Sequence, residues 1–138
     1  MNSAFVSVDW AGRPVRIEHR WIAPERTSAP LVVFLHEGLG SLAMWKDFPQ
    51  RVCDSARVRG LVYSRPGYGR STPRQAEQAW GLDFMHRQAH EVLPALFEAL
   101  GIDAAIVSTV FPSRSPCAGK AIGPLRFRLI ARAAGLPL

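Results

Sequence analysis

The chain has 138 residues, which is the length of one ordinary domain. Its hydrophobic fraction of 48% suits a protein with a packed core and excludes an intrinsically disordered chain. No run approaches the ~20 apolar residues of a membrane span, and the N-terminus lacks the basic and apolar regions of a secretory signal, so we expect a cytoplasmic protein.

The net charge of +6 is unevenly distributed. Residues 1–103 hold 12 of the 17 Arg and Lys and all 11 Asp and Glu, whereas residues 104–138 hold the other five basic residues and no acid. Pro, Gly and Ala spread these five residues apart, so we expect neither nucleic acid nor a membrane as a partner. Cys53 and Cys117 are too few for a disulfide framework and lack metal-ligand spacing. We expect two reduced thiols, no metal and no cofactor.

The first part of the chain has the pattern of strands. Residues 3–9 alternate weakly between apolar and polar, which predicts a first strand. Stronger alternation over residues 14–21 predicts an antiparallel strand with one wet face. Residues 23–30 form a polar turn, and the continuous apolar run 31–35 predicts a strand covered on both faces. The expected wet face of the second strand carries Arg16, Glu18 and Arg20.

A helix and a further strand follow. Gly38 and Gly40 end the apolar strand. Apolar residues at near-helical spacing over residues 42–53 predict a helix, whose first turn Pro49 would interrupt or kink. Residues 59–63 then predict a second short buried strand.

Residues 65–81 are rich in Gly, Pro, Arg and Gln and predict a long surface loop. Residues 82–100 predict the longest helix, with Asp83 as its N-cap, a kink at Pro94 and a stop at Gly101. Its expected apolar stripe consists of Phe84, Ala89, Val92, Leu93, Leu96, Phe97 and Leu100.

The order of elements predicts the fold class. Residues 104–110 predict another buried strand, so two leading strands precede strands that alternate with helices. This order argues for an α/β fold with a mostly parallel sheet between two helical layers. We expect a domain over residues 1–110 and a poorly ordered, basic Pro/Gly-rich tail over 111–138, in which residues 125–134 form one short helix. Residues 104–110 would then be an exposed apolar edge through which chains self-associate.

Two loops carry a family resemblance. Residues 36–41, His-Glu-Gly-Leu-Gly-Ser, are similar to the His-Gly loop that follows the third strand of α/β-hydrolases. Residues 63–71 are similar to that superfamily's aspartate-arginine-glycine-x-glycine-x-serine stretch. Over residues 3–110 the chain resembles the branch of small esterases, C–C-bond hydrolases and dehalogenase-like enzymes. The resemblance implies the N-terminal part of an α/β-hydrolase fold, with antiparallel leading strands and truncated after the fifth strand.

The resemblance also implies an oxyanion loop. Acyl transfer places negative charge on a carbonyl oxygen, and each backbone N–H aimed at that oxygen stabilises it by ~3–4 kcal/mol. Glycines let the backbone approach the substrate closely. His36, the first residue of the loop, would brace the loop by hydrogen bonding and would not be the catalytic base. An ordinary strand-to-helix turn is the alternative, and residues 63–71 are expected to be purely structural. The loop residues are His36, Glu37, Gly38, Leu39 and Gly40, with one donor at Glu37, Gly38 or Leu39.

The nucleophile expected after the fifth strand is not evident, because no Gly-x-Ser-x-Gly turn occurs in the sequence. Ser113 has the bulky Phe111 two residues before it, where the turn needs a small residue. Ser115 is followed by Pro116, which has no N–H to give to an oxyanion. Both serines are therefore weak candidates. No Asp, Glu or His lies beyond Asp103, although the superfamily's acid and histidine follow its nucleophile.

His86 and His90 lie one helical turn apart and suggest a metal pair. No acidic third ligand stands at an obvious spacing, so a solvated or partly buried helix face is the favoured interpretation.

The sequence therefore predicts a truncated hydrolase that is inactive as this chain. The ancestral reaction would be hydrolysis of an ester or similar small substrate by a nucleophilic serine. The abrupt loss of acids favours a change of reading frame or a recombination near residues 105–112 over a naturally divergent short protein. Two alternatives stay open: a non-catalytic binding module that uses the edge strand or the basic tail, and a complete short hydrolase that uses Ser113 or Ser115.

Overall fold

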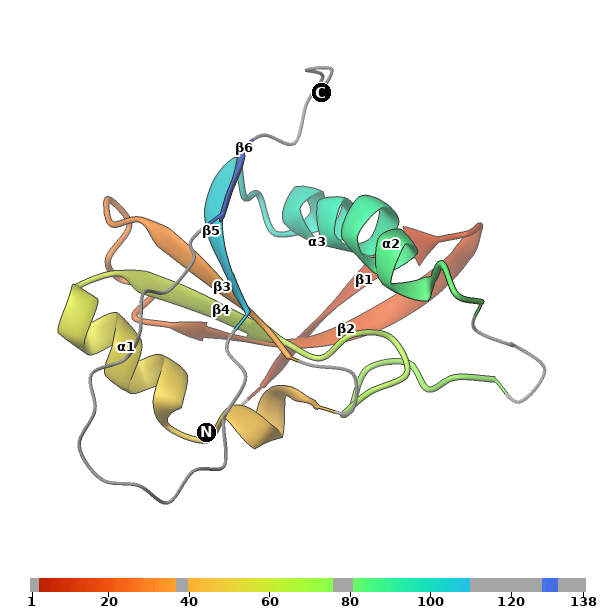
Figure 1. Cartoon of the computed structure of the whole chain (residues 1–138), viewed down its shortest axis with the longest axis horizontal. Coiled ribbons are helices and arrows are strands. Elements are labelled where there is room, and N and C mark those ends of the chain that lie inside the picture. The colour runs from red at the N-terminus through yellow and green to blue at the C-terminus, as the bar shows by residue number, and fades with distance from the viewer. Residues whose placement is uncertain (1–2, 37–39, 76–80, 110–127, 132–138) are drawn as a thin grey trace.

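The computed structural model of the chain describes residues 3–36, 40–75, 81–109 and 128–131. In these residues six strands form one sheet with the order β1-β2-β4-β3-β5-β6 (Figure 1). The leading pair β1–β2 is antiparallel, and β3 is parallel to both β4 and β5, as the sequence predicts. The strands are β1 Ala4–Trp10, β2 Arg13–Ile22, β3 Leu31–Leu35, β4 Arg59–Tyr63, β5 Ala104–Thr109 and β6 Arg128–Ala131.

Helices cover both faces of this sheet. Figure 1 shows α1 on one face and the segment α2–α3 on the other, which confirms the three-layer α/β arrangement. None of the helices in the described ranges is both long and apolar enough to cross a bilayer. The helices are the 3-10 helix η1 Leu42–Trp45, α1 Phe48–Ala56, α2 Phe84–Arg87, the π-helical turn η2 Gln88–Val92 and α3 Leu93–Ala99.

Strand β3 separates two hydrophobic clusters. Its side chains point alternately to opposite faces of the sheet, as in any strand. Leu31 and Val33 belong to the cluster under α3, whereas Val32 and Phe34 belong to the cluster that includes residues of η1 and α1. All four are buried, which confirms the prediction of a strand covered on both faces.

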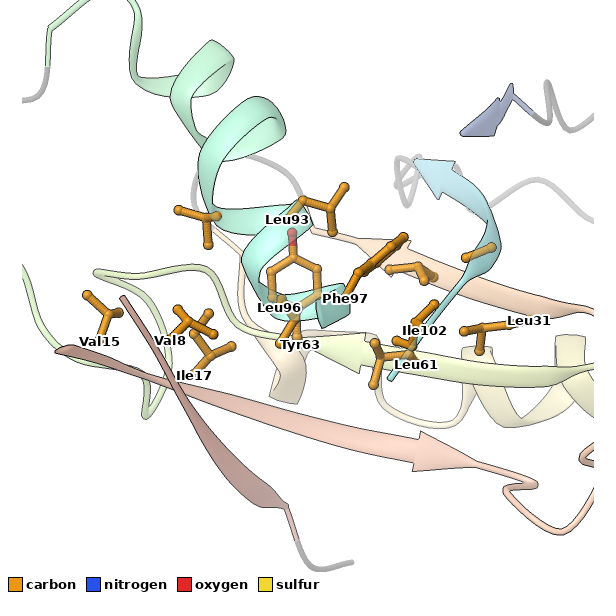
Figure 2. Close-up of a cluster of buried hydrophobic side chains, with 13 residues drawn as sticks. Val8, Val15, Ile17, Leu31, Leu61, Tyr63, Leu93, Leu96, Phe97 and Ile102 are labelled. Carbon is orange, nitrogen blue, oxygen red and sulfur yellow. The ribbon is translucent and has the colours of Figure 1, made fainter. Parts of the chain in front are cut away.

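The larger cluster lies between α3 and the sheet. Figure 2 shows Leu93, Leu96 and Phe97 of α3 beside Leu61 and Tyr63 of β4. Burial of each such side chain is worth ~1.5–3 kcal/mol, so this contact holds the long helix against the strands whose ends form the candidate site.

The longest predicted helix is confirmed with local corrections. It begins at Phe84, and the side chain of Asp83 makes no capping hydrogen bond. Ala89, expected in the apolar stripe, is exposed, and Gln88 is buried in its place. The π-helical turn explains the shift, because a turn with i→i+5 bonds holds an extra residue and rotates the buried face. Pro94, which has no N–H for an i→i−4 bond, lies two residues after the end of this turn.

The predicted helix over residues 125–134 is wrong where the structure describes it, because residues 128–131 form β6. This strand pairs antiparallel with residues 104–107 of β5, so the expectation of a free edge at β5 is wrong as well. An uncovered apolar strand presents a row of unpaired N–H and C=O groups, and a partner strand satisfies them. The expected boundary at residue 110 and the rest of the tail lie outside the described residues.

Candidate oxyanion-loop site

Three parallel strands end side by side. Phe34 of β3 pairs with Val62 of β4, and Leu35 pairs with Thr109 of β5. The chain adds β4 on one side of β3 and then β5 on the other, so the direction of sheet growth reverses at β3. Ligand sites of open α/β sheets form outside the carboxyl ends of the strands at such a reversal. The residues that directly follow these strands therefore make up the candidate site.

Arg65, which follows β4, holds the start of the loop after β3. Its backbone N–H donates to His36 Nε2 at 2.9 Å, and its Nη2 donates to the His36 carbonyl oxygen at 2.6 Å. Arg65 Nη2 also lies 3.2 Å from His36 Nδ1, so Arg65 contacts both nitrogens of the imidazole ring. The ring also lies edge-on to Tyr68, with the centroids 5.2 Å apart. Both the main chain and the side chain of His36 are thus fixed.

Arg65 also brings a positive charge to the loop. Its side chain is buried, lies 5.5 Å from the centre of the Tyr68 ring and contacts the sulfur of Met85. Burial lowers the pKa of Arg65, an effect that Tyr63 and Tyr68 oppose. A guanidinium nevertheless stays protonated in proteins. The charge therefore makes the electrostatic potential at the start of the loop more positive.

Ser64 holds the far end of the same loop. Its side chain is fully buried, and its hydroxyl oxygen accepts the Leu42 N–H at 2.9 Å. Leu42 begins η1, and the preceding residue Ser41 makes no side-chain capping bond. Ser64 therefore satisfies one of the N–H groups that a helix leaves unpaired at its start. The neighbouring residues Ser64 and Arg65 thus hold both ends of the segment 36–42.

A buried carboxylate supports Ser64 from the second strand. Glu18 was expected on a wet face, and this is wrong, because only 5% of Glu18 is exposed. The loop after β4 covers this face of β2. Glu18 Oε2 accepts hydrogen bonds from the Ser64 hydroxyl and from the Arg70 N–H, both at 3.0 Å. Alternation along a strand reveals its two faces, but it does not reveal a loop that arrives from far along the sequence.

The carboxylate of Glu18 is charged at neutral pH. Burial by itself raises the pKa of Glu18, but hydrogen bonds from Arg70, Ser3 and Ser64, together with the Arg70 charge, bring the net pKa below its ordinary value. A charged acceptor makes stronger hydrogen bonds than a neutral one, so the carboxylate holds its donors firmly.

Two glycines allow these close approaches. A Cβ at Gly40 would lie 3.0 Å from the Cβ of His36, so a larger residue would push the loop away from the imidazole. Gly69 has φ +54°, and a Cβ there would lie 2.5 Å from Ser64 Oγ and 2.9 Å from Glu18 Oε2. A glycine is therefore required at position 69, because the backbone there has a positive φ and because Ser64 leaves no space for a Cβ.

Of the sequence-predicted site residues, His36 and Gly40 lie together at the carboxyl end of β3. Glu37, Gly38 and Leu39 fall outside the described residues, and so do Ser113 and Ser115. The role of the loop as an oxyanion hole therefore stays a prediction. Sequence reasoning missed Glu18 altogether. It treated residues 63–71 as purely structural, and within them Ser64 and Arg65 make the hydrogen bonds that hold the loop after β3.

Two features lie apart from this site. His86 and His90 are exposed, with parallel rings whose centroids lie 6.4 Å apart. Among the described residues, no three His, Cys, Asp or Glu side chains gather as a metal site requires. A surface hollow lies beside the start of β3, opposite the candidate site, and is lined by Arg26, Ala29, Asp54 and Arg57.

Comparisons with known proteins agree with the fold. No family model and no curated protein matches the sequence. The structure is similar to the enol-lactonase from Burkholderia xenovorans, with 22% identity and a TM-score of 0.58 over 78% of this chain and 36% of that one. It is also similar to a membrane phospholipase A described as a bacterial virulence factor, with 17% identity and a TM-score of 0.58 over 78% of this chain and 31% of that one.

A third similar structure is described under novel epoxide hydrolases of the α/β-hydrolase superfamily in metagenomes from hot environments. It shares 22% identity and a TM-score of 0.58 over 79% of this chain and 34% of its own. The chain thus spans between 31% and 36% of the length of these three proteins. Its fold is that of the N-terminal part of α/β-hydrolases.

Proposed function

We propose that this chain carries the oxyanion-loop half of a serine hydrolase that acts on an ester or a similar small-molecule substrate. The observation that carries the proposal is the way Ser64 and Arg65 hold both ends of the segment 36–42, at the point where the sheet reverses. An ordinary strand-to-helix turn does not need a buried arginine and a buried serine at its two ends. A loop that has to present N–H groups in a fixed direction does need such support.

The proposed chemistry divides between this half and a second one. The loop after β3 stabilises the oxyanion with a backbone N–H, and the buried Arg65 makes its surroundings favourable for negative charge. The nucleophile, the second N–H donor, the acid and the histidine belong to the segment that follows β5 in this superfamily. The sequence beyond Asp103 has no Asp, Glu or His. We therefore propose that this chain alone has no hydrolase activity.

A change of reading frame or a recombination near residues 105–112 is the proposed origin of this composition. All 11 acids lie within residues 1–103, and none follows Asp103. The segment upstream has a complete pattern of strands and helices. The segment downstream has neither the turn nor the triad residues that would make use of the upstream half.

A phosphonate probe for reactive serines tests the proposed inactivity. The purified chain is treated with a fluorescent fluorophosphonate and, separately, with a p-nitrophenyl ester. We expect neither labelling nor ester hydrolysis above the rate of the heat-denatured chain. Labelling that disappears in Ser113→Ala or in Ser115→Ala would contradict the proposal and would establish a complete short hydrolase.

The rival proposal of a binding module has less support. It relied on a free edge at β5, and β6 lies along that edge. The basic tail lies mainly outside the described residues. The proposed partner is therefore a small-molecule substrate, and neither nucleic acid nor a membrane is proposed. A defined complex between this chain and a protein partner, with residues 110–138 at the interface, would favour the binding module instead.

A further inference from the structure

We propose that Glu18 is a positioning residue for Leu42, at the end of the loop after β3, and that it acts through the direction of the Ser64 hydroxyl. The inference rests on the proposed function only for the meaning of this loop as an oxyanion loop. Its geometric content, a connection from β2 through Ser64 to the Leu42 amide, stands on the contacts alone.

The single proton of the Ser64 hydroxyl group can point in only one direction at a time. Ser64 Oγ has one hydrogen to donate and two lone pairs with which to accept. Its oxygen lies 3.0 Å from Glu18 Oε2 and 2.9 Å from the Leu42 N. A carboxylate only accepts hydrogen bonds, so the hydroxyl proton has to point at Glu18. A lone pair of Ser64 Oγ then faces the Leu42 N–H.

The surroundings leave the hydroxyl little alternative. Ser64 is fully buried and Glu18 is only 5% exposed. The main chain of Glu18 is tied to the same loop, because its N–H donates to Ser71 Oγ at 2.9 Å and its carbonyl accepts the Ser64 N–H at 2.9 Å. Glu18 therefore binds the loop after β4 through its N–H, its carbonyl and its carboxylate. These three contacts hold its side chain next to Ser64.

The same carboxylate oxygen accepts a second hydrogen bond. Glu18 Oε2 accepts the Arg70 N–H at 3.0 Å, and Arg70 itself lies over the ring of Phe5 at 5.2 Å. One oxygen thus receives two donors, from Ser64 and from Arg70. An amide oxygen in the same place could receive both, whereas an aliphatic side chain could receive neither.

These contacts predict a graded series of variants. Glu18→Leu removes the acceptor, frees the hydroxyl proton of Ser64 and speeds exchange of the Leu42 amide with solvent. Ser64→Ala removes the partner of that amide directly. For each we expect exchange at Leu42 to be about fivefold faster, the equivalent of ~1 kcal/mol. Glu18→Gln keeps an oxygen in place, so we expect it to restore most of the protection.

Amide hydrogen exchange by NMR on the full chain is the test. The Leu42 amide is compared with the Val33 amide in the centre of the sheet, which reports the global stability. Glu91→Leu is the matched control, because it removes an exposed carboxylate on the long helix, far along the chain from this loop. We expect faster exchange at Leu42 relative to Val33 in Glu18→Leu, and no such change in the control.

Two results would overturn the proposal. The first is unchanged relative exchange at Leu42 in Glu18→Leu. The second is an equal loss of protection at Leu42 and Val33, which would make Glu18 a general stabiliser and nothing more.

An acid titration of the unmodified chain decides the question if Glu18→Leu fails to fold. We expect the Leu42 amide shift to follow protonation of Glu18, and we expect this titration to vanish in Glu18→Gln. A Leu42 shift that titrates identically in both chains, or in neither, contradicts the proposal. These measurements do not involve hydrolysis, so they succeed or fail independently of the phosphonate test.

Discussion

Replacement of Gly69 by alanine tests the packing of the candidate site most simply. This glycine has φ +54°, and its missing Cβ leaves the space in which Ser64 and Glu18 meet. A methyl group there would lie 2.5 Å from Ser64 Oγ and 2.9 Å from Glu18 Oε2. Real Cβ atoms do not approach so closely, so the substitution has to separate the hydroxyl from the carboxylate.

The expected cost has two parts. Holding an L-residue in the left-handed region costs ~1–2 kcal/mol. Breaking a buried hydrogen bond to a charged group costs a further ~1.5–3 kcal/mol. Gly69→Ala should therefore lower the free energy of unfolding by ~2.5–5 kcal/mol, the sum of the two parts.

Gly101→Ala provides the matched control. Gly101 has φ +65°, and nothing lies within 4 Å of its would-be Cβ, so only the conformational part applies. Urea unfolding followed by circular dichroism should place Gly69→Ala at least ~1.5 kcal/mol below Gly101→Ala. Equal losses of stability in the two variants would refute the close contact between Ser64 and Glu18.

Three further predictions concern the core, the pH dependence and the thiol. Leu96→Ala, which truncates a fully buried side chain, should cost ~3–4 kcal/mol in urea unfolding, whereas the exposed Leu82→Ala should change stability by less than ~0.5 kcal/mol. Equal effects would contradict the packing of α3. The pKa of Glu18 is lowered in the folded chain, so its contribution to stability is present above the ordinary carboxyl pKa of about 4.5 and is lost as the pH falls below it. Glu18→Gln should weaken the acid-induced loss of stability measured between pH ~6 and ~3, and an unchanged difference from the parent chain would contradict this. Burial raises the pKa of Cys53 to about 11, so in a Cys117→Ser chain this thiol should react with Ellman's reagent at pH ~8 only as fast as the protein unfolds; immediate reaction without denaturant would show that it is accessible.

The order of elements could be predicted from local patterns. The continuous apolar run 31–35 is buried on both faces, and the strands at 59–63 and 104–109 lie beside it as parallel neighbours. Such runs identify buried strands from the local sequence alone, because a strand covered on both sides needs apolar residues throughout. The glycines after 31–35 likewise indicate where the chain leaves the sheet.

The predictions of burial and secondary structure were wrong where contacts with distant segments determine the local structure. Glu18 has the sequence pattern of an exposed residue and is buried because a loop that begins at Ser64 folds over it. Ala89 is displaced from the apolar stripe by a π-helical turn, which the ideal period of 3.6 residues does not contain. Residues 128–131 form a strand because β5 offers an unpaired edge, and nothing in their own composition requires it.

The position of the candidate site could be predicted from the sequence, but the contacts that hold its loop could not. A His-x-Gly-x-Gly loop after a buried strand indicated where the site lies, and His36 is found there. The residues that hold the loop could not be recognised from spacing alone. Their role depends on contacts between segments that are brought together only when β2, β3 and β4 become neighbours.

We propose that residues 3–109 are the oxyanion-loop half of a hydrolase, and that a change of reading frame, rather than a recombination, separates them from its nucleophile. The most direct test is to sequence the gene from the codon of His90 to well past the stop codon and to translate every frame. The account predicts that a second frame continues from the β5 region into a Gly-x-Ser-x-Gly turn, followed by an Asp and a His. If no other frame contains these residues, the claim is contradicted, and the chain has to be explained as a protein without this catalytic half.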